Sequence, residues 1–439
     1  MMPDAAGPAF DVCVVGAGPA GMMLGLLLAR DGLETCVLEK HADFLRDFRG
    51  DTVHPSTLDL LDSIGLGERV RDLPGRQVTG LRFSFADGTY QVADFSRLRV
   101  SHPYIYFVPQ WDLLEMLAQA GADIPTFTLL REHEVTGLVR DGDRVVGAEA
   151  RTAQGRRVVR ARLTVGADGR GSVVRASLGL PLRRFGAPMD VLWFRLPRRA
   201  SDGDGLGGLV GPGRMLIRID RGSYWQTAYL IRKGGYDAVH AAGLDRLRDN
   251  VATLAPDLAD RVDEIRSWED VHLLRVQVDR VRRWHAPGAL LIGDAAHAMS
   301  PIGGVGINLA IQDAVAAARI LRAPLLAGRG TGTAPPPGRL AAVQRRRTPP
   351  TILTQLAQRV AQRGLLRPVL EAGDKPVTAP MPVRLLARIP AAQRVLARAV
   401  GVGLRPEAVG QAAPHTATEN VSRAATGDSV IVSTGIAPS

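Results

Sequence analysis

Short apolar runs alternate with helix-like segments along the first 320 residues. Phe10 to Val15 (FDVCVV) is almost wholly apolar, which is typical of a buried parallel strand, and Gly16 to Gly21 follows it as a turn. Met22 to Asp31 is rich in Leu, Met and Ala and predicts a helix, and Thr35 to Glu39 predicts a second strand. The chain therefore opens with a βαβ unit.

Further strands of this type lie far along the chain. Val158 to Ala167 runs into Asp168-Gly169, and Ala289 to Ile292 runs into Gly293-Asp294. The intervening segments 76–100 and 186–280 are rich in strand-like sequence instead. The pattern predicts an α/β fold, in which residues 1–75, 101–185 and 281–322 form a Rossmann-like nucleotide-binding domain and residues 76–100 and 186–280 form an inserted β-sheet substrate domain.

The chain beyond residue 322 changes character. The glycine- and proline-rich stretch 328–338 and the pair Pro349-Pro350 predict a linker over 323–350. Residues 351–405 have a helical pattern, with Leu353, Leu356 and Val360 on one side. Residues 406–439 are small and polar without periodicity, and we expect a disordered tail.

Composition narrows the class of protein. A chain of 439 residues with 46% apolar and 23% charged residues is globular and long enough for two domains. The net charge of +11 suggests a nucleic-acid partner, but only Lys40, Lys233 and Lys375 of the 55 basic residues are lysines, and the one compact basic run is Arg345 to Arg347. We therefore expect no nucleic-acid binding.

Two cysteines, Cys13 and Cys36, and nine scattered histidines offer neither a disulfide framework nor metal-ligand spacing. We expect no metal and a cytoplasmic, reducing location. The uncharged stretch Val12 to Ala29 is interrupted by glycines and is not preceded by a basic segment, so we expect neither a spanning helix nor an export signal.

The first loop carries a dinucleotide-binding motif. Gly16-Ala17-Gly18-Pro19-Ala20-Gly21 fits GxGxxG between a predicted strand and helix, and Glu39 ends the next strand. Such glycines allow a pyrophosphate to approach a helix N-terminus, and the acid accepts hydrogen bonds from a ribose. FAD and NAD share this motif, so it does not choose between them.

Two later motifs carry a family resemblance. Val165 to Arg175 (VGADGRGSVVR) resembles the DG motif of the FAD-dependent aromatic hydroxylases, and Leu291 to Ala314 is similar to their GD motif over its whole length. Order and spacing of all three motifs also agree. The chain thus resembles the para-hydroxybenzoate hydroxylase-like, class A flavoprotein monooxygenases, which implies an FAD-binding domain of that type, an inserted substrate sheet and C-terminal helices.

The GD motif implies the flavin contacts. By resemblance, Asp294 after Gly293 accepts hydrogen bonds from the ribityl hydroxyls, although an N-cap aspartate would fit the same pattern. Gly303, Gly304, Val305 and Gly306 would let the chain pass close to the flavin, and a helix beginning near Ile307-Asn308 would point its positive end at the ring. Pro301 would lie beside the flavin and shape the catalytic site, unless it merely ends a loop.

The resemblance implies further cofactor contacts elsewhere. Asp168 would support FAD and the pyridine nucleotide, with a turn-forming Asp-Gly as the alternative. Lys40, Arg46 and Arg49 follow the second strand near the expected diphosphate and nicotinamide positions, and Arg49 is also a catalytic candidate. Gln110 would lie near the pyrophosphate, and Val135 would meet the adenine through its backbone, unless it is simply a buried strand residue.

The implied reaction is a monooxygenation. In the family, NADPH or NADH reduces FAD, O₂ adds to form a flavin C4a-hydroperoxide, and an electron-rich aromatic or polyketide-like substrate is hydroxylated. Gly205 to Gly213 lacks the strand and helix of a second nucleotide motif, as in this family. A flavin dehydrogenase or reductase without oxygen insertion remains the alternative, because neither reaction requires a recognisable acid or base.

Substrate and partners are less constrained. We expect a small aromatic substrate, a monomer or homodimer, and C-terminal helices that pack on the FAD domain in preference to a membrane surface. His54 and His297 are expected to be structural. Candidate walls of the substrate pocket are the aromatic and apolar residues of the inserted domain, namely Phe83, Phe85, Tyr90, Val191, Trp193, Phe194, Met215, Tyr224 and Trp225.

Overall fold

The computed structural model describes residues 10–45, 52–202 and 206–409. Its first sheet has the strand order β19-β20-β11-β1-β2-β8, and the four central pairings of this series, from β20 to β8, are parallel. β10 pairs antiparallel with β11 and with β9. The strands are β1 (Phe10–Val15), β2 (Thr35–Leu38), β8 (Phe127–Leu130), β9 (Glu134–Asp141), β10 (Arg144–Thr152), β11 (Gly155–Gly166), β19 (His285–Ala286) and β20 (Ala289–Leu291).

A second sheet of seven strands is built from two separate chain segments. Its order is β17-β13-β16-β15-β14-β5-β6, and β14 and β5 join the segments as the parallel pair. Its strands are β5 (Gly80–Phe85), β6 (Gly88–Asp94), β13 (Met189–Pro197), β14 (Leu206–Gly211), β15 (Arg214–Asp220), β16 (Tyr224–Arg232) and β17 (His272–Leu274). Two small sheets contain β3 (Thr52–Val53), β7 (Ile105–Phe107) and β4 (Arg76–Val78), and β12 (Leu182–Arg184) and β18 (Asp279–Val281).

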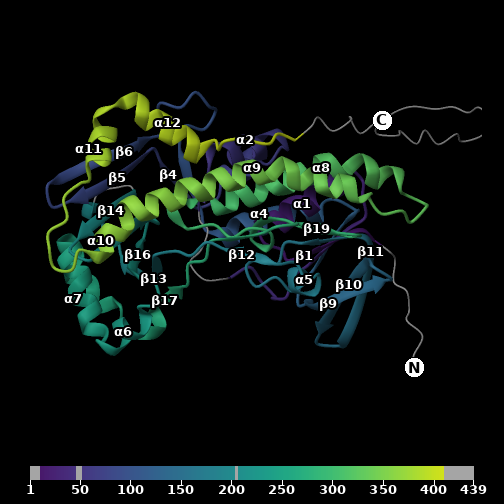
Figure 1. Ribbon diagram of the computed structural model, residues 1–439, viewed down its shortest axis with the longest axis horizontal. Coiled ribbons are helices and arrows are strands. Elements are labelled where there is room, and N and C mark those ends of the chain that lie inside the picture. The colour runs from purple at the N-terminus through teal and green to yellow at the C-terminus, as the bar shows by residue number, and fades with distance from the viewer. Residues whose placement is uncertain (1–9, 46–51, 203–205, 410–439) are drawn as a thin grey trace, which may run out of the picture. The chain divides into compact units, whose positions relative to one another are not determined.

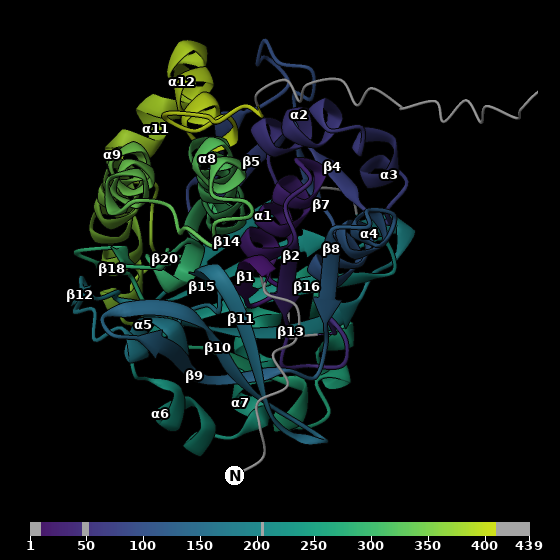
Figure 2. The same ribbon diagram turned by 90° about the vertical axis from the view of Figure 1, so that its right-hand side faces the viewer.

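Helices cover both sheets. α1 and α8 pack side by side on the first sheet, with α9 against α8, while the β9–β10 ribbon lies on the other side of that sheet (Figures 1 and 2). The α-helices are α1 (Pro19–Arg30), α2 (Pro55–Ser63), α3 (Gly67–Arg71), α4 (Gln110–Ala122), α5 (Val173–Ser177), α6 (Tyr236–Ala241), α7 (Leu244–Leu254), α8 (Gly306–Ala327), α9 (Pro337–Ala361), α10 (Arg367–Glu371), α11 (Met381–Arg388) and α12 (Pro390–Gly401). Short turns are η1 (Ala200–Asp202), η2 (Pro256–Glu264), η3 (Trp268–Asp270), η4 (Gly293–Ala295), η5 (Ile302–Gly304) and the π-helical η6 (Gln362–Leu366).

Burial follows the alternation of strand side chains. In β13, Leu192 and Phe194 face a core formed with α7 and η2, whereas Met189 and Val191 face a core formed with η6 and α10. The second sheet is therefore apolar on both faces. The predicted α/β class with a separate β-sheet is confirmed.

The expected linker over 323–350 is wrong at both ends. α8 continues to Ala327, and α9 begins at Pro337 and runs through Pro349 and Pro350. The prolines do not end α9 because its buried residues, among them Leu340 and Val343, hold it in the core against α8. Tertiary packing thus outweighs the local breaker signal, and the irregular connection shrinks to residues 328–336.

The expected tail also begins too early. Glu407 is buried, and its carboxylate accepts from Arg346 Nε at 2.6 Å and from Arg347 Nη1 at 3.2 Å. Two of the three arginines in the basic run therefore serve an internal ion-pair cluster. Residues 410–439 of the expected tail lie outside the described residues.

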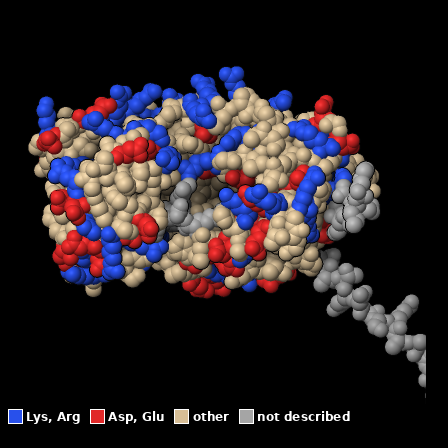
Figure 3. Space-filling model, turned by 90° about the horizontal axis from the view of Figure 1, so that it is seen from below, with Lys and Arg blue, Asp and Glu red and all other residues tan. Residues whose placement is uncertain are grey.

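One helical segment, Ile302–Ala327, is long and apolar enough to cross a membrane, but 72% of its most apolar stretch is buried inside the protein, as expected of a core helix. On the face shown in Figure 3, basic and acidic side chains are interspersed and the surface is hollowed near its middle. The basic excess does not form a single continuous patch on that face.

Candidate active site

Four predicted motif loops meet at one edge of the first sheet. The loops follow β20, β11, β1 and β2, which are neighbours in that order and run parallel, so their carboxyl ends lie side by side. Backbone hydrogen bonds link adjacent loops: Ile292 N–H donates to Gly166 O, Ala167 N–H to Val15 O and Gly16 N–H to Leu38 O. Ligands of open α/β sheets bind at this edge.

The three glycines of the first loop have different surroundings. A Cβ on Gly16 would lie 2.6 Å from Ala167 O, and one on Gly21 would lie 1.9 Å from Gly16 O, so these two glycines allow the strand, loop and helix to pack closely. A Cβ on Gly18 would meet nothing within 4 Å. Gly18 is also the N-cap of α1, where no side chain caps the helix. The loop therefore leaves open space in front of free N–H groups, which suits an anion.

Glu39 closes the first loop from the side of β2. One carboxylate oxygen accepts from Ala17 N–H at 3.1 Å, and the other accepts from His41 N–H at 3.0 Å. Glu39 is buried, whereas Lys40 beside it is exposed. The acid is thus fixed next to the glycine loop, where we predicted a ribose acceptor.

Asp168 has a structural role that the sequence offered only as the alternative. Its carboxylate accepts from the Ser172 hydroxyl at 2.6 Å and from Val174 N–H at 3.1 Å, which holds the turn before α5. Burial raises the pKa of Asp168 even though these hydrogen bonds lower it. The turn-forming reading therefore explains this side chain, and its predicted contact with cofactors stays a prediction.

The loop after β20 is held by buried side chains. Gly293 N–H donates to Asp313 Oδ2 at 3.1 Å, and His297 Nε2 lies 2.6 Å from the same oxygen. Burial raises the pKa of Asp313, but His297 and Arg347 outweigh it and hold the pKa below its usual range. His297 thus anchors the loop, as expected for a structural histidine.

Asp294 stays accessible in this loop. Its side chain is 40% exposed, and Arg170 Nε of the neighbouring loop lies 3.9 Å from its carboxylate. The N-cap of the turn η4 is Ile292, so the alternative role of Asp294 as an N-cap is wrong. An exposed carboxylate beside the open glycine loop suits the hydroxyls of a bound ligand.

The segment from Pro301 to Asn308 brings a second uncapped helix to the site. Pro301 is exposed, Gly303 and Gly304 have φ of 78° and 62°, which is the left-handed region that favours glycine, and α8 begins at Gly306 without a side-chain cap. The side chain of Asn308 holds the loop: its amide donates to Thr52 O at 3.1 Å, and its oxygen accepts from His54 N–H at 2.9 Å, while its predicted contact with the flavin stays a prediction. Val305 and Ile307 are buried beside it.

The side chains and helix N-termini at this edge of the sheet fit a flavin dinucleotide. An open glycine, two uncapped helix N-termini, a fixed acid and an accessible aspartate converge from four loops. The FAD binding domain family matches residues 9–351 of the chain. The chain belongs to this family of FAD-binding proteins.

The most similar relatives agree on the reaction class. 6-Methylpretetramide 4-monooxygenase of Streptomyces rimosus is 37% identical over 321 residues, which are 73% of this chain and 77% of that protein. The 12-dehydrotetracycline 5-monooxygenase/anhydrotetracycline 6-monooxygenase of Streptomyces rimosus subsp. rimosus is 33% identical over 74% of this chain, although the match spans only 64% of that protein. The solved structure of OxyS anhydrotetracycline hydroxylase from Streptomyces rimosus has a TM-score of 0.69 and 26% identity, covering 92% of this chain and 78% of that one.

The protein is therefore an FAD-dependent monooxygenase, and the predicted resemblance, cofactor FAD and enzyme class are confirmed. Two predicted residues of the flavoprotein, Arg46 and Arg49, lie outside the described residues. Gln110 is half-buried as the first residue of α4, and Val135 is buried in β9 opposite Ala150. The predicted roles of these four residues stay predictions.

Sequence reasoning missed a row of glutamines that supports the loop around Pro301. Gln358 Oε1 accepts from Ser300 N–H at 3.1 Å, while its Nε2 donates to Ser300 O and Ile302 O at 2.9 Å each. Gln362 Nε2 donates to the Ser300 hydroxyl at 2.9 Å. Gln355, Gln358 and Gln362 are buried and spaced by three and four residues, so a helical stripe of glutamines was the available signal.

The predicted substrate walls divide between the two faces of the second sheet. Phe194 and Trp225 lie in the core beneath α7 and η2, because strand alternation points them to the face opposite to Ile302, and this position does not support their predicted role as pocket walls. Trp193 lies on the opposite face, and its buried indole N–H has no hydrogen-bond partner among the residues that the structure describes. That face also holds Phe85, Val191 and Met215, and Ile302 of the flavin loop packs against it.

Proposed function

We propose that the flavoprotein uses NADPH or NADH and O₂ to hydroxylate a flat, polycyclic aromatic polyketide. The observation that carries this proposal is the 37% identity, over most of both chains, to a protein named 6-methylpretetramide 4-monooxygenase. The four intact cofactor loops support the same reaction class, since an FAD site is what the chemistry requires.

The residues of the chain bind and orient the cofactor. When bound, FAD supplies the electron transfer and oxygen activation, which no protein side chain provides. The uncapped N-terminus of α1 would hold the diphosphate over Gly18, Glu39 would bind a ribose, and Asp294 would bind ribityl hydroxyls. The N-terminus of α8 would place its partial positive charge beside the flavin ring, where it would stabilise the negative charge that develops during the reaction.

The inner face of the second sheet supports the substrate class. Trp193 and Ile217 are half-buried there, next to buried Val191 and Ala228, and Ile302 of the flavin loop packs against the same apolar cluster. Such a surface matches fused aromatic rings and excludes water from the reacting carbon. The free indole N–H of Trp193 is a hydrogen-bond donor for a phenol or ketone oxygen of the substrate.

The reaction is tested by oxygen labelling. The holoenzyme, given NADPH or NADH and a panel of tetracyclic aromatic substrates under ¹⁸O₂, is expected to place one ¹⁸O atom in the product and one in water, with one reduced nucleotide oxidised for each product. Product without ¹⁸O would identify the alternative, a dehydrogenase or reductase. Nucleotide oxidation that no member of the panel stimulates would refute the proposed substrate class.

Two further parts of the proposal concern the whole protein. We propose that it acts in the cytoplasm, where both nucleotides are available and Cys13 and Cys36 remain free thiols, as they are in the structure. We also propose that a monomer or homodimer is the active species. Light scattering of the holoenzyme at assay concentration tests the second point.

A further inference from the structure

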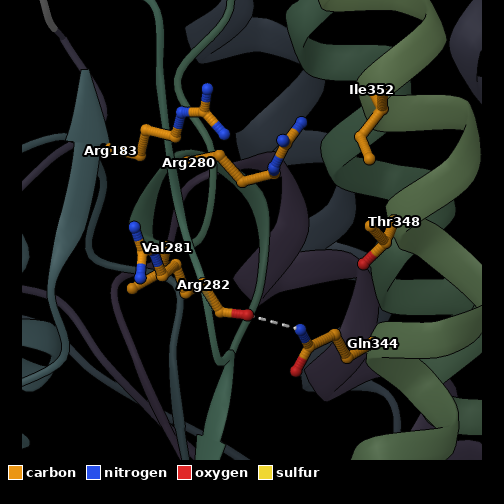
Figure 4. A pocket seen from close by; sticks show the side chains of 7 residues that line it. All are labelled: Arg183, Arg280, Val281, Arg282, Gln344, Thr348 and Ile352. Carbon is orange, nitrogen blue, oxygen red and sulfur yellow. Dashed lines mark hydrogen bonds between the residues drawn. The ribbon is translucent and has the colours of Figure 1, made fainter.

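A pocket of about 210 Å³ lies between the β12–β18 ribbon and α9. None of the residues that line it belongs to the four cofactor loops. Its walls come from the two strands and from Gln344, Thr348 and Ile352 of α9 (Figure 4). The figure shows Arg183 and Arg280 side by side at one end, with α9 across from them. The volume corresponds to roughly seven water molecules, which is enough room for a hydrated oxyanion.

The arginines of this pocket are close together without a counter-charge. Arg183 and Arg280 are directly opposite each other across the antiparallel pair β12–β18, where like charges are destabilising. Both lie over the ring of Phe185 together with Arg359 of α9, which is not part of the pocket wall, and the three guanidinium carbons are 5.1 to 5.3 Å from the ring centroid. Within the described part of the chain, none of the three pairs with a carboxylate. Burial and the nearby Arg183 lower the pKa of Arg280, as expected of an uncompensated cation.

A second polar group in the pocket is also unsatisfied. The Thr348 hydroxyl is buried and has no hydrogen-bond partner among the described residues. A buried hydroxyl without a partner carries a free-energy cost that an incoming acceptor oxygen would remove. The guanidinium groups can only donate hydrogen bonds, and the hydroxyl can donate one more. The pocket is therefore complementary to an anion with several oxygen atoms.

We propose that this pocket binds a phosphoryl group, either as free phosphate or as part of a phosphorylated molecule. A tetrahedral phosphate dianion offers each guanidinium its own oxygen atoms, and it neutralises two facing cations, which one carboxylate would not. This site is separate from the proposed hydroxylation and does not rest on it.

The pocket is connected to the flavin loop. Arg280 Nη1 donates to Gln355 Oε1 at 3.0 Å, and Gln355 Nε2 donates to Ala298 O at 3.1 Å and to Asp279 O at 2.8 Å. A phosphoryl group bound to Arg280 would therefore contact the hydrogen-bond partner of Gln355, and Gln355 also holds the backbone of Ala298, shortly before Pro301.

Phosphate titration of the holoenzyme tests the proposal. Unfolding temperature and binding heat are measured against inorganic phosphate at constant ionic strength, with chloride as the balancing ion. We expect phosphate to raise the unfolding temperature of the wild type, and Arg183→Gln and Arg280→Gln each to weaken phosphate binding about tenfold or more. Arg184→Gln is the matched control, because Arg184 is on the same strand, is exposed and does not line the pocket.

Two results would overturn the proposal. If phosphate and chloride act alike, or if Arg183→Gln and Arg280→Gln respond to phosphate as Arg184→Gln does, the pocket is not a phosphate site. Displacement of bound phosphate by NADPH but not by NADH would identify the additional phosphate of NADPH as the natural group. Saturable, arginine-dependent phosphate binding that neither nucleotide displaces would support the site and exclude both nucleotides as its natural ligand. Arg183 is exposed, so its variant remains informative even if Arg280→Gln fails to fold.

Discussion

Gly18 and Gly21 belong to one motif, yet the structure assigns their substitution opposite consequences. Gly21→Ala places a methyl group 1.9 Å from a backbone oxygen, and neither α1 nor the loop can yield without losing its packing on β1. We expect the free energy of unfolding of the apoprotein to fall by about 3 kcal/mol, at the upper end for overpacking. Gly18 has an ordinary extended backbone, with φ −72° and ψ −179°, and open space beside it. Gly18→Ala should change apoprotein stability by less than about 1 kcal/mol.

The same pair should separate in FAD affinity. If the space beside Gly18 holds the diphosphate, a methyl group there displaces it, and the dissociation constant should rise at least about tenfold, or about 1.4 kcal/mol. Urea unfolding of the FAD-free variants gives the stability, and quenching of flavin fluorescence gives the affinity. A Gly18→Ala variant that binds FAD as tightly as the wild type would contradict this placement of the diphosphate. A Gly21→Ala variant of normal stability would contradict the packing argument instead.

Three further predictions concern other parts of the molecule. Asp294→Ala should weaken FAD binding about tenfold, while urea unfolding of the apoprotein changes by no more than about 0.5 kcal/mol, because the side chain is 40% exposed. A chain ending at Arg405 should lose about 3 kcal/mol relative to one ending at Val409, because removal of Glu407 takes away one of the two carboxylates that pair with the buried Arg347 and leaves only Asp313; equal chemical stability would show that the Arg347–Glu407 ion pair is dispensable. Burial lowers the pKa of His54 to about 4, so between pH 6.5 and 4 the unfolded state binds a proton that the folded state does not. About 3 kcal/mol of stability should therefore be lost as the pH falls through that window, and His54→Gln should show a flatter dependence of stability on pH.

The parts of the fold that were predictable rest on local signals. β1 occupies the predicted residues, and α1 and β2 lie within a few residues of theirs, because a buried parallel strand, a glycine turn and a helix each leave a short contiguous pattern. The convergence of four loops was predictable only through the order of the motifs. Their actual proximity depends on the strand order β20-β11-β1-β2, which no local pattern encodes.

What the sequence could not supply is the partner of each polar side chain. Asp168 and Asn308 are in motifs that resemble a flavin site, but their side chains are occupied by Ser172 and Val174, and by Thr52 and His54. In both cases the motif residue is needed to shape the loop. A motif thus predicts the position of a loop more reliably than the hydrogen-bond partners of its side chains.

The C-terminal segment is a second case in which the sequence did not predict the partners of polar side chains. Its arginines and glutamines carry no local signal of burial, yet Arg347 is fully buried between Asp313 and Glu407, and Gln358 holds both sides of Pro301. A buried charge or amide is stable only when partners distant in sequence satisfy it. These contacts make α9 and Glu407 part of the support of the flavin loop. Substitutions at Arg347 and Gln358 of α9, which lies outside the glycine-rich motifs, should therefore affect the flavin site through Asp313 and Ser300.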